Sequence, residues 1–171
     1  MGLAIFIRLL EILIVVAGVY LVARLVIFAF LKNEEKNRET LIRKETTATL
    51  FPLKLQASER LILFLERMTP AQAINRAMQP GMTAIELQMT LVKNIREEYE
   101  HNTAQQLYIS PGCWALVKNA KEEVIRVINL AVSESGEGAT GADVAKTLLL
   151  SWSVLDTDPV QTAISQIKSE I

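Results

Sequence analysis

The stretch TPAQAINRAMQPGMTAIELQMTLVKNIREEY, residues 69–99, contains the signals that decide the fold. Thr69 followed by Pro70 is typical of a helix start, because proline in the first turn lacks an N–H that the helix does not need there. The tripeptide QPG at 79–81 predicts a turn. Thr83 and Glu86 have the T-x-x-E spacing of a capping box. The stretch therefore predicts a short helix, a turn and a longer, well-capped helix.

The same start signals recur along the rest of the chain, and no alternating strand pattern of useful length appears. Helices are predicted at 53–68, 70–78 and 83–102, and onward from Ser110-Pro111, Thr140 and Asp158-Pro159. The stretch SESGEGATG, residues 133–141, is predicted as a loop. We therefore expect residues 52–171 to form a compact, all-α soluble bundle of five or six helices.

Each predicted helix carries apolar residues at the three- and four-residue spacing of one face. The helix at 53–68 is apolar all round at 61–65 (LILFL), which predicts a central position in the bundle. The side chains predicted to face the core elsewhere are Leu87, Leu91, Ile95, Tyr99, Trp114, Val117, Val124, Ile128, Ala131, Val132, Val144, Leu148, Trp152, Leu155, Val160, Ala163, Ile164, Ile167 and Ile171.

Composition excludes several classes of function. The net charge of −1 gives no basic field for nucleic acid, and the few aromatic residues are not interleaved with basic ones. The only cysteine, Cys113, cannot form a disulfide within the chain. The only histidine, His101, leaves most zinc sites and catalytic triads without enough ligands. We expect no cofactor and no nucleic-acid partner.

The N-terminal run ILIVVAGVYLVARLVIFAFL, residues 12–31, has the length and apolar character of a helix that crosses a bilayer. We therefore predict a transmembrane anchor at 1–31, with the lipid bilayer as a partner. The charge of Arg24 would extend toward the headgroups or pair with a carboxylate of another membrane helix. Arg8 and Glu11 lie three residues apart and are expected to pair at the opposite interface.

Residues 32–51 are mostly polar and predict a charged juxtamembrane linker, either a helical stalk or a flexible tether. Most basic residues that flank the run follow it, and only Arg8 precedes it. This bias predicts a single-pass inner-membrane protein with its C-terminal domain in the cytoplasm. A β-branched TTAT stretch at 46–49, followed by Pro52, is expected to end the helix before the bundle begins.

Glu98 and His101 have the E-x-x-H spacing of carboxylate di-iron bundles. A complete site would need a second motif and two more glutamates, so a metal could be held only across a symmetric dimer. The alternative is a solvated, charged helix end. At 100° per residue, Glu98 also falls inside an apolar stripe, as Lys121 does in the next helix. We therefore predict a half-buried structural pair between Glu98 and Lys121, with two solvent-facing side chains as the alternative.

Cys113 follows the predicted helix start at Ser110, where the helix dipole lowers a thiol pKa. A nucleophilic role would also need a base. The alternative interpretation is a small packing residue. We therefore predict no catalytic residue.

Several stretches resemble a family of small single-pass membrane proteins of Bacteroidota-type bacteria. They are PLKLQASERLILFLER at 52–67, QPGMT at 79–83, REEYEHNTAQQLYIS at 96–110 and KEEVIRVIN at 121–129. The resemblance implies a bacterial inner-membrane setting and transfers no catalytic residue, because that family has no assigned activity.

The leading functional hypothesis is a membrane-anchored helical interaction module, which would act as a scaffold or accessory subunit of a protein complex. Its protein partner is not identified by the sequence, and a homo-oligomer is compatible with it. The alternative is a membrane-bound enzyme or metal-binding protein that uses Glu98 and His101 across a dimer. A lipid-surface sensor that uses the basic linker is a third hypothesis.

Overall fold

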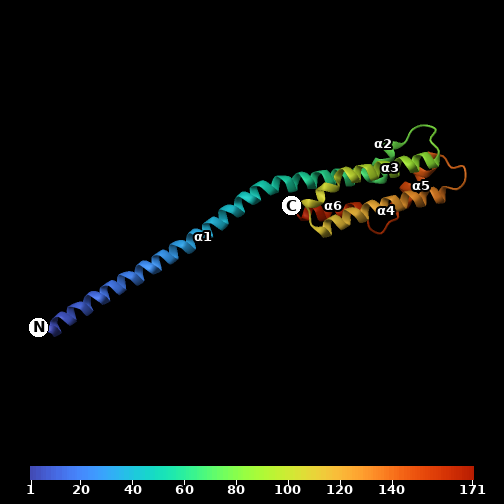
Figure 1. Cartoon of the computed structure of the whole chain (residues 1–171). Helices are drawn as coiled ribbons and strands as arrows, with labels where there is room; N and C mark the ends of the chain where they lie inside the picture. Colours follow the sequence, from blue (N-terminus) through green and yellow to red (C-terminus); the bar gives the residue numbers. More distant parts are fainter. The chain divides into compact units, whose positions relative to one another are not determined.

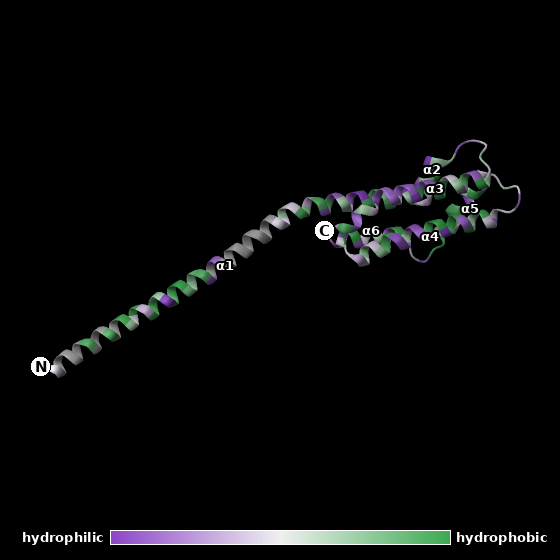
Figure 2. Cartoon of the chain, viewed as in Figure 1, coloured by the Kyte–Doolittle hydropathy of each residue, from purple (hydrophilic) through white to green (hydrophobic). Residues whose placement is uncertain are grey.

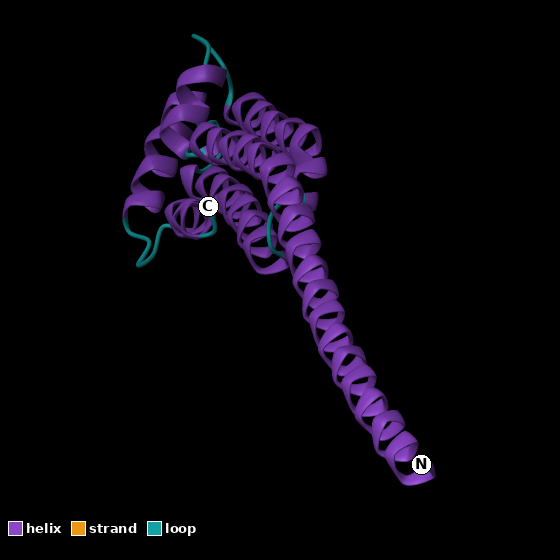
Figure 3. Ribbon diagram, turned by 90° about the vertical axis from the view of Figure 1, so that its left-hand side faces the viewer, coloured by secondary structure: helices purple, strands orange, loops and turns teal.

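The computed structural model describes the backbone of residues 1–171 and all side chains except those of residues 3–8, 10–12, 14–15, 33 and 35–45. The elements are α1 (Gly2–Met68), α2 (Pro70–Ala77), α3 (Ala84–Asn102), the 3-10 helix η1 (Thr103–Leu107), α4 (Pro111–Ser135), α5 (Gly141–Ser153) and α6 (Pro159–Ser169). Over the described backbone, Figure 3 shows helices and loops and no strand. The prediction of an all-α fold is confirmed.

The chain divides into two compact units, Met1–Leu50 and Phe51–Ile171. The second unit, called the bundle below, contains the end of α1 together with α2 to α6 (Figure 1). Helix α4 packs against α3, α5 and α6, and α3 also contacts α2 and α5. Helices α3 and α4 run antiparallel: Gln88 near the start of α3 bonds Asn129 near the end of α4 at 2.9 Å, and Tyr99 near the end of α3 stacks on Trp114 near the start of α4.

The predicted capping signals start the helices of the bundle. The side chain of Ser110 accepts a hydrogen bond from the N–H of Cys113 at the start of α4, and Asp158 accepts two from the first turn of α6. Thr69 and Pro70 open α2 as predicted, although the Thr69 side chain makes no capping bond there. The Ser110 and Asp158 side chains thus satisfy N–H groups that the helix itself leaves without an acceptor.

Two capping boxes lie side by side at the starts of α3 and α5. Thr83 and Glu86 form one, and Thr140 and Asp143 form the other, which the sequence analysis had not recognised. Thr83 and Thr140 form an isolated antiparallel bridge. Within it, the N–H of Gly141 donates to the carbonyl of Met82 at 2.8 Å, and the N–H of Ala84 donates to the carbonyl of Ala139 at 3.3 Å. Backbone bonds therefore tie the two helix starts together.

The apolar faces predicted from periodicity meet in one core. Figure 2 shows hydrophobic and hydrophilic residues alternating along α3 and α4, as expected for helices with one buried face. One detail differs: Leu61, Phe64 and Leu65 are buried, but 51% of Leu63 is exposed, so α1 is not enclosed on all sides. The predicted core residues that are only partly buried are Tyr99, Trp114, Val132, Trp152 and Leu155. Ile171 is exposed, contrary to its predicted inward position.

Helix α1 continues through Pro52, so the predicted break before the bundle is wrong. Proline removes one backbone hydrogen bond from a helix, but the helix can continue when the residues after the proline are packed in the core. Ala57, Leu61 and Phe64 supply that packing. The backbone of the predicted linker, residues 32–51, lies within α1. Most of its charged side chains lie outside the described residues.

Within the residues that the structure describes, no helix combines the length and the apolarity that a membrane crossing requires. A crossing needs about 20 consecutive apolar residues. The unbroken described part of the N-terminal run is residues 16–31, and it contains the exposed Arg24. The predictions of a transmembrane anchor at 1–31, of single-pass topology and of an inner-membrane location are therefore wrong. Arg8 and Glu11 lie outside the described side chains.

Hydrogen bonds join the C-terminal end of α6 to the start of α4 and to Lys54, which lies where α1 enters the bundle. The N–H of Ser110 donates to the Glu170 carboxylate at 3.1 Å, and the Ser110 hydroxyl donates a second, short hydrogen bond to it. The Lys54 ammonium donates to the backbone carbonyl of Glu170 at 2.5 Å. The hydroxyl bond from Ser110 is the main reason that the pKa of Glu170 lies below its ordinary value of 4.5.

Replacing this carboxylate, Glu170→Gln, is expected to cost about 1 kcal/mol of unfolding free energy at pH 7, because a charge-assisted bond in a partly exposed place is lost. The folded-state pKa is lowered, so the stabilisation is fully present above the unfolded-state pKa and disappears as the pH falls through the folded-state value. Urea unfolding of both proteins at pH 7 and at about pH 3 measures this. A difference of equal size at both pH values would contradict the role of the charge.

Candidate functional site

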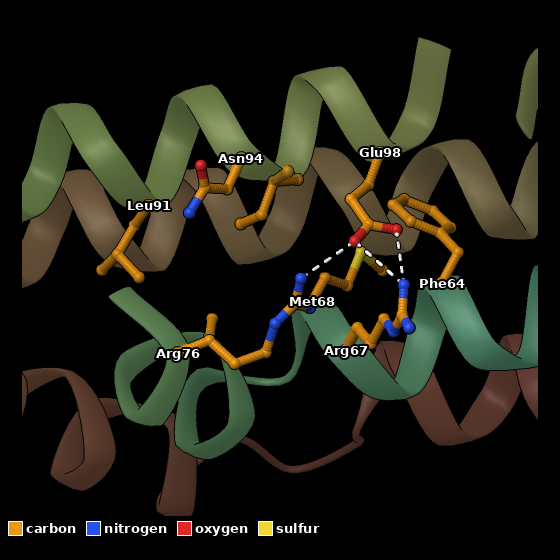
Figure 4. A pocket seen from close by; sticks show the side chains of 9 residues that line it. Phe64, Arg67, Met68, Arg76, Leu91, Asn94 and Glu98 are labelled. Carbon is orange, nitrogen blue, oxygen red and sulfur yellow. Dashed lines mark hydrogen bonds and ion pairs between the residues drawn. The ribbon is translucent and has the colours of Figure 1, made fainter. Parts of the chain in front are cut away.

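Three helices converge on the carboxylate of Glu98 in α3. Arg67 near the end of α1 donates to its two oxygens at 3.2 and 3.5 Å, and Arg76 in α2 donates to one of them at 3.0 Å. Figure 4 shows both guanidinium groups approaching the carboxylate from the same side. Because one acid neutralises only one of the two arginines, the cluster keeps a net positive charge. Its clear role is to fasten α1 and α2 to α3.

A small cavity of about 20 Å³ lies beneath this cluster. Its lining residues are Phe64, Arg67, Met68, Ala73, Arg76, Leu91, Asn94, Ile95 and Glu98. A water molecule needs roughly 10–15 Å³ by this kind of measure, whereas pockets for small molecules are roughly 300–1,000 Å³. The cavity can therefore hold about one water molecule, and it cannot enclose a substrate.

Glu98 and Lys121, which were predicted to pair, have other partners. Lys121 lies over the ring of Tyr99, 4.2 Å from its centroid, and pairs with Glu122 at 2.8 Å. Among the described residues no ion pair joins Lys121 to Glu98. Neighbouring residues on a helix point about 100° apart, so the side of α3 that faces α4 presents Tyr99, while Glu98 faces α1 and α2.

Tyr99 lies within an aromatic cluster that joins three helices. Its ring stacks on Trp114 of α4 with centroids 5.5 Å apart, and it meets Phe64 of α1 at 6.1 Å in a tilted arrangement. The cation of Lys121 covers the Tyr99 ring. Aromatic pairs and cation–π contacts of this kind add to the burial of apolar area. The cluster explains why Lys121 occurs on an otherwise apolar face.

The residues of the metal hypothesis are engaged in other contacts. The Glu98 carboxylate binds two arginines, and Nδ1 of His101 lies 2.8 Å from the backbone carbonyl oxygen of Glu97. Within the described part of the chain, no group of three or more His, Cys, Asp or Glu residues is placed to hold a metal ion. A site shared between two copies is not tested by these observations and stays a hypothesis.

Cys113 is fully buried in the core at the start of α4. Burial raises the pKa of its thiol to about 11, and the nearby negative charge of Glu170 acts in the same direction. The predicted lowering by the helix dipole is therefore outweighed. At neutral pH Cys113 stays a thiol and acts as a packing residue.

The outward face of α3 carries exposed large apolar side chains next to two hollows in the surface. Ile85 is 63% exposed and Met89 is 66% exposed, one helical turn apart. A shallow groove of about 490 Å³ runs beside Met89, between α3 and Asn129 of α4. A second depression of about 470 Å³ joins Met89 to the turn at residues 79–82. Met89 thus stands between two hollows.

Methionine is concentrated at this end of the bundle. Met78 is exposed, Met82 is partly buried, and both flank the turn that precedes α3. Unbranched, polarisable methionine side chains adapt to apolar partners of different shape. The sequence analysis missed this surface, because Met78, Met82 and Met89 follow no single helical repeat. The signal available in the sequence was Ile85 and Met89 on the side opposite Leu87, Leu91 and Ile95.

Comparison with known proteins gives a family but no activity. No curated protein and no solved structure is significantly similar to the chain. One family, described as a family of unknown function, has a sequence profile that matches residues 4–171. Its description names no source organism, so the resemblance to proteins of Bacteroidota-type bacteria stays a prediction. Because the match covers almost the whole length, the chain belongs to this family of unknown function, DUF7935.

Proposed function

We propose that the bundle is a non-enzymatic helical module that binds a helical segment of another polypeptide through the outward face of α3. The observation that carries the proposal is the exposure of Ile85 and Met89 side by side on a helix whose opposite face is fully packed. Large apolar side chains that are exposed to solvent and lie next to one another mark interaction sites more often than scattered ones do.

The shape of this surface suits a helix. Ile85 and Met89 lie along the axis of α3, and the groove beside Met89 follows the same axis as far as Glu100. An amphipathic helix that lies in such a groove inserts apolar residues at three- and four-residue spacing. The small Arg67–Glu98–Arg76 cavity, by contrast, holds about one water molecule, so small-molecule chemistry has no enclosed place there.

Photo-crosslinking in the cells that naturally make the protein tests this proposal. A photoreactive amino acid in place of Met89 is expected to give an adduct of one discrete mass, and the added substitution Ile85→Glu should reduce its yield, because a charge enters the contact. The matched control carries the same photoreactive group at Asn119, an exposed position of α4 outside both grooves. Absence of an adduct at position 89, or equal adducts at both positions, would contradict the proposal.

A further inference from the structure

The outward face of α3 carries its charges in two blocks. Lys93 and Arg96 come first, and Glu97 and Glu100 follow toward the C-terminal end of the helix. All four residues are exposed. At 100° per residue, the directions of Lys93, Arg96 and Glu100 fall within about 60° of one another, with Glu97 beside them. The exposed strip therefore changes from basic to acidic along its length.

The four charged side chains of this strip form only one weak ion pair among the described residues. Lys93 and Glu97 approach to 3.8 Å, close to the limit for an ion pair, and their order along the helix, base before acid, is the less favourable one. Exposed pairs of this kind contribute little to stability. Among the described residues, Arg96 and Glu100 have no ion-pair partner. The strip is thus free to make its ion pairs with another molecule.

Apolar side chains lie beyond both ends of the charged strip. Ile85 and Met89 precede the basic block. Leu107, which ends η1 directly after α3, follows the acidic block and is 79% exposed. Read along the chain, the order is apolar, basic, acidic, apolar. In an antiparallel copy the order is apolar, acidic, basic, apolar. Each basic block then lies opposite an acidic block, and each apolar end lies opposite an apolar end.

This inference rests on the proposed function and names the partner. We infer that the helical segment bound by α3 is the α3 of a second copy of this chain, antiparallel to the first, with a two-fold axis between residues 96 and 97. Lys93 then faces Glu100 of the partner subunit, and Arg96 faces Glu97 of the partner subunit. A two-fold interface requires such a self-complementary surface, in which each contact occurs twice.

The remaining contacts follow from the same axis. By residue count, the same axis matches Leu107 of the partner subunit, at the end of η1, with position 86, which lies between Ile85 and Met89. Apolar burial at the two ends supplies attraction, and the four charge pairs select the antiparallel orientation. A parallel arrangement would place Lys93 and Arg96 against the same basic residues of the partner subunit, which repel them.

A charge exchange in the full-length protein tests the dimer. Lys93→Glu with Arg96→Glu makes the strip wholly acidic, and Glu97→Lys with Glu100→Lys makes it wholly basic. We expect the wild type to dimerise, each double variant to dissociate with a Kd raised about tenfold or more, and an equimolar mixture of the two variants to form a heterodimer. Sedimentation equilibrium measures the Kd values, and native mass spectrometry identifies the heterodimer.

The matched control is Lys118→Glu with Lys168→Glu, which makes the same change of charge at exposed positions elsewhere in the bundle. It should dimerise like the wild type, and circular dichroism should show all variants folded. A wild-type monomer, unaffected double variants or a mixture without heterodimer would overturn the inference. If the dimer is overturned in this way, a crosslinked adduct at position 89 whose mass is not twice that of the chain would still support the proposed function. Absence of any adduct at position 89 would overturn both the proposed function and the dimer.

Discussion

Leu61→Ala is expected to lower the unfolding free energy of the bundle by about 3 kcal/mol, within the range measured for buried leucines. Leu61 is fully buried in α1 among the core residues of the bundle. Removing three carbon atoms there leaves a space that close-packed neighbours fill only in part. A loss of this size should lower Tm by roughly 10 °C for a domain of this size. Thermal and urea unfolding followed by tryptophan fluorescence measure it, since both tryptophans lie in the bundle.

Leu63→Ala is the matched control, because it makes the same substitution two residues further along the same helix. Leu63 is half exposed, so its truncation should cost less than about 1 kcal/mol. The comparison cancels the change in helix propensity, which is the same for both variants. Equal losses for the two variants would mean that the side of α1 placed in the core is misassigned.

Gly141→Ala is expected to destabilise the bundle by about 1–3 kcal/mol, although alanine is normally the better helix former. A Cβ at position 141 would lie 3.0 Å from the carbonyl oxygen of Met82 and 3.3 Å from the Met82 Cβ. The same carbonyl accepts the N–H of Gly141, so it cannot move away without lengthening that bond. The strain therefore falls on the bridge between the starts of α3 and α5.

Gly112→Ala is the control for this prediction. Gly112 also lies in the first turn of a helix, α4, but the nearest atom to an added Cβ is the Ser110 hydroxyl at 3.9 Å. This variant should be neutral or stabilising by up to about 1 kcal/mol. Urea unfolding of both variants at pH 7 gives the comparison. A Gly141→Ala protein as stable as the wild type would show that the two helix starts are not in tight contact.

The elements of the bundle were predictable because their start signals are local. Thr83 with Glu86 and Ser110 with Pro111 act through hydrogen bonds and backbone angles within one turn, and the structure begins α3 and α4 at these positions. Periodicity placed Leu87, Leu91 and Val117 on buried faces for the same reason. Pro52 misled the prediction, since packing beyond the proline determined the outcome.

The polar contacts were not predictable to the same extent, because they depend on how helices turn about their axes. The antiparallel arrangement of α3 and α4 brings Lys121 to Tyr99, one residue from the predicted partner Glu98. The true partners of Glu98 are Arg67 and Arg76, which come from helices that the pattern of α3 alone does not reveal. The exposed face of α3 was visible in the sequence only as residues left over from the core.

The neighbouring starts of α3 and α5 have a consequence for behaviour in acid. Each helix start carries a partial positive charge, and the bridge holds the two starts together. Hydrogen bonds from Thr83 and Thr140 lower the pKa of Glu86 and of Asp143, so both carboxylates stay ionised below the pH at which free carboxyls take up protons. Once the pH falls through the lowered pKa values of Glu86 and Asp143, both counter-charges are lost, and the paired starts of α3 and α5 should weaken together.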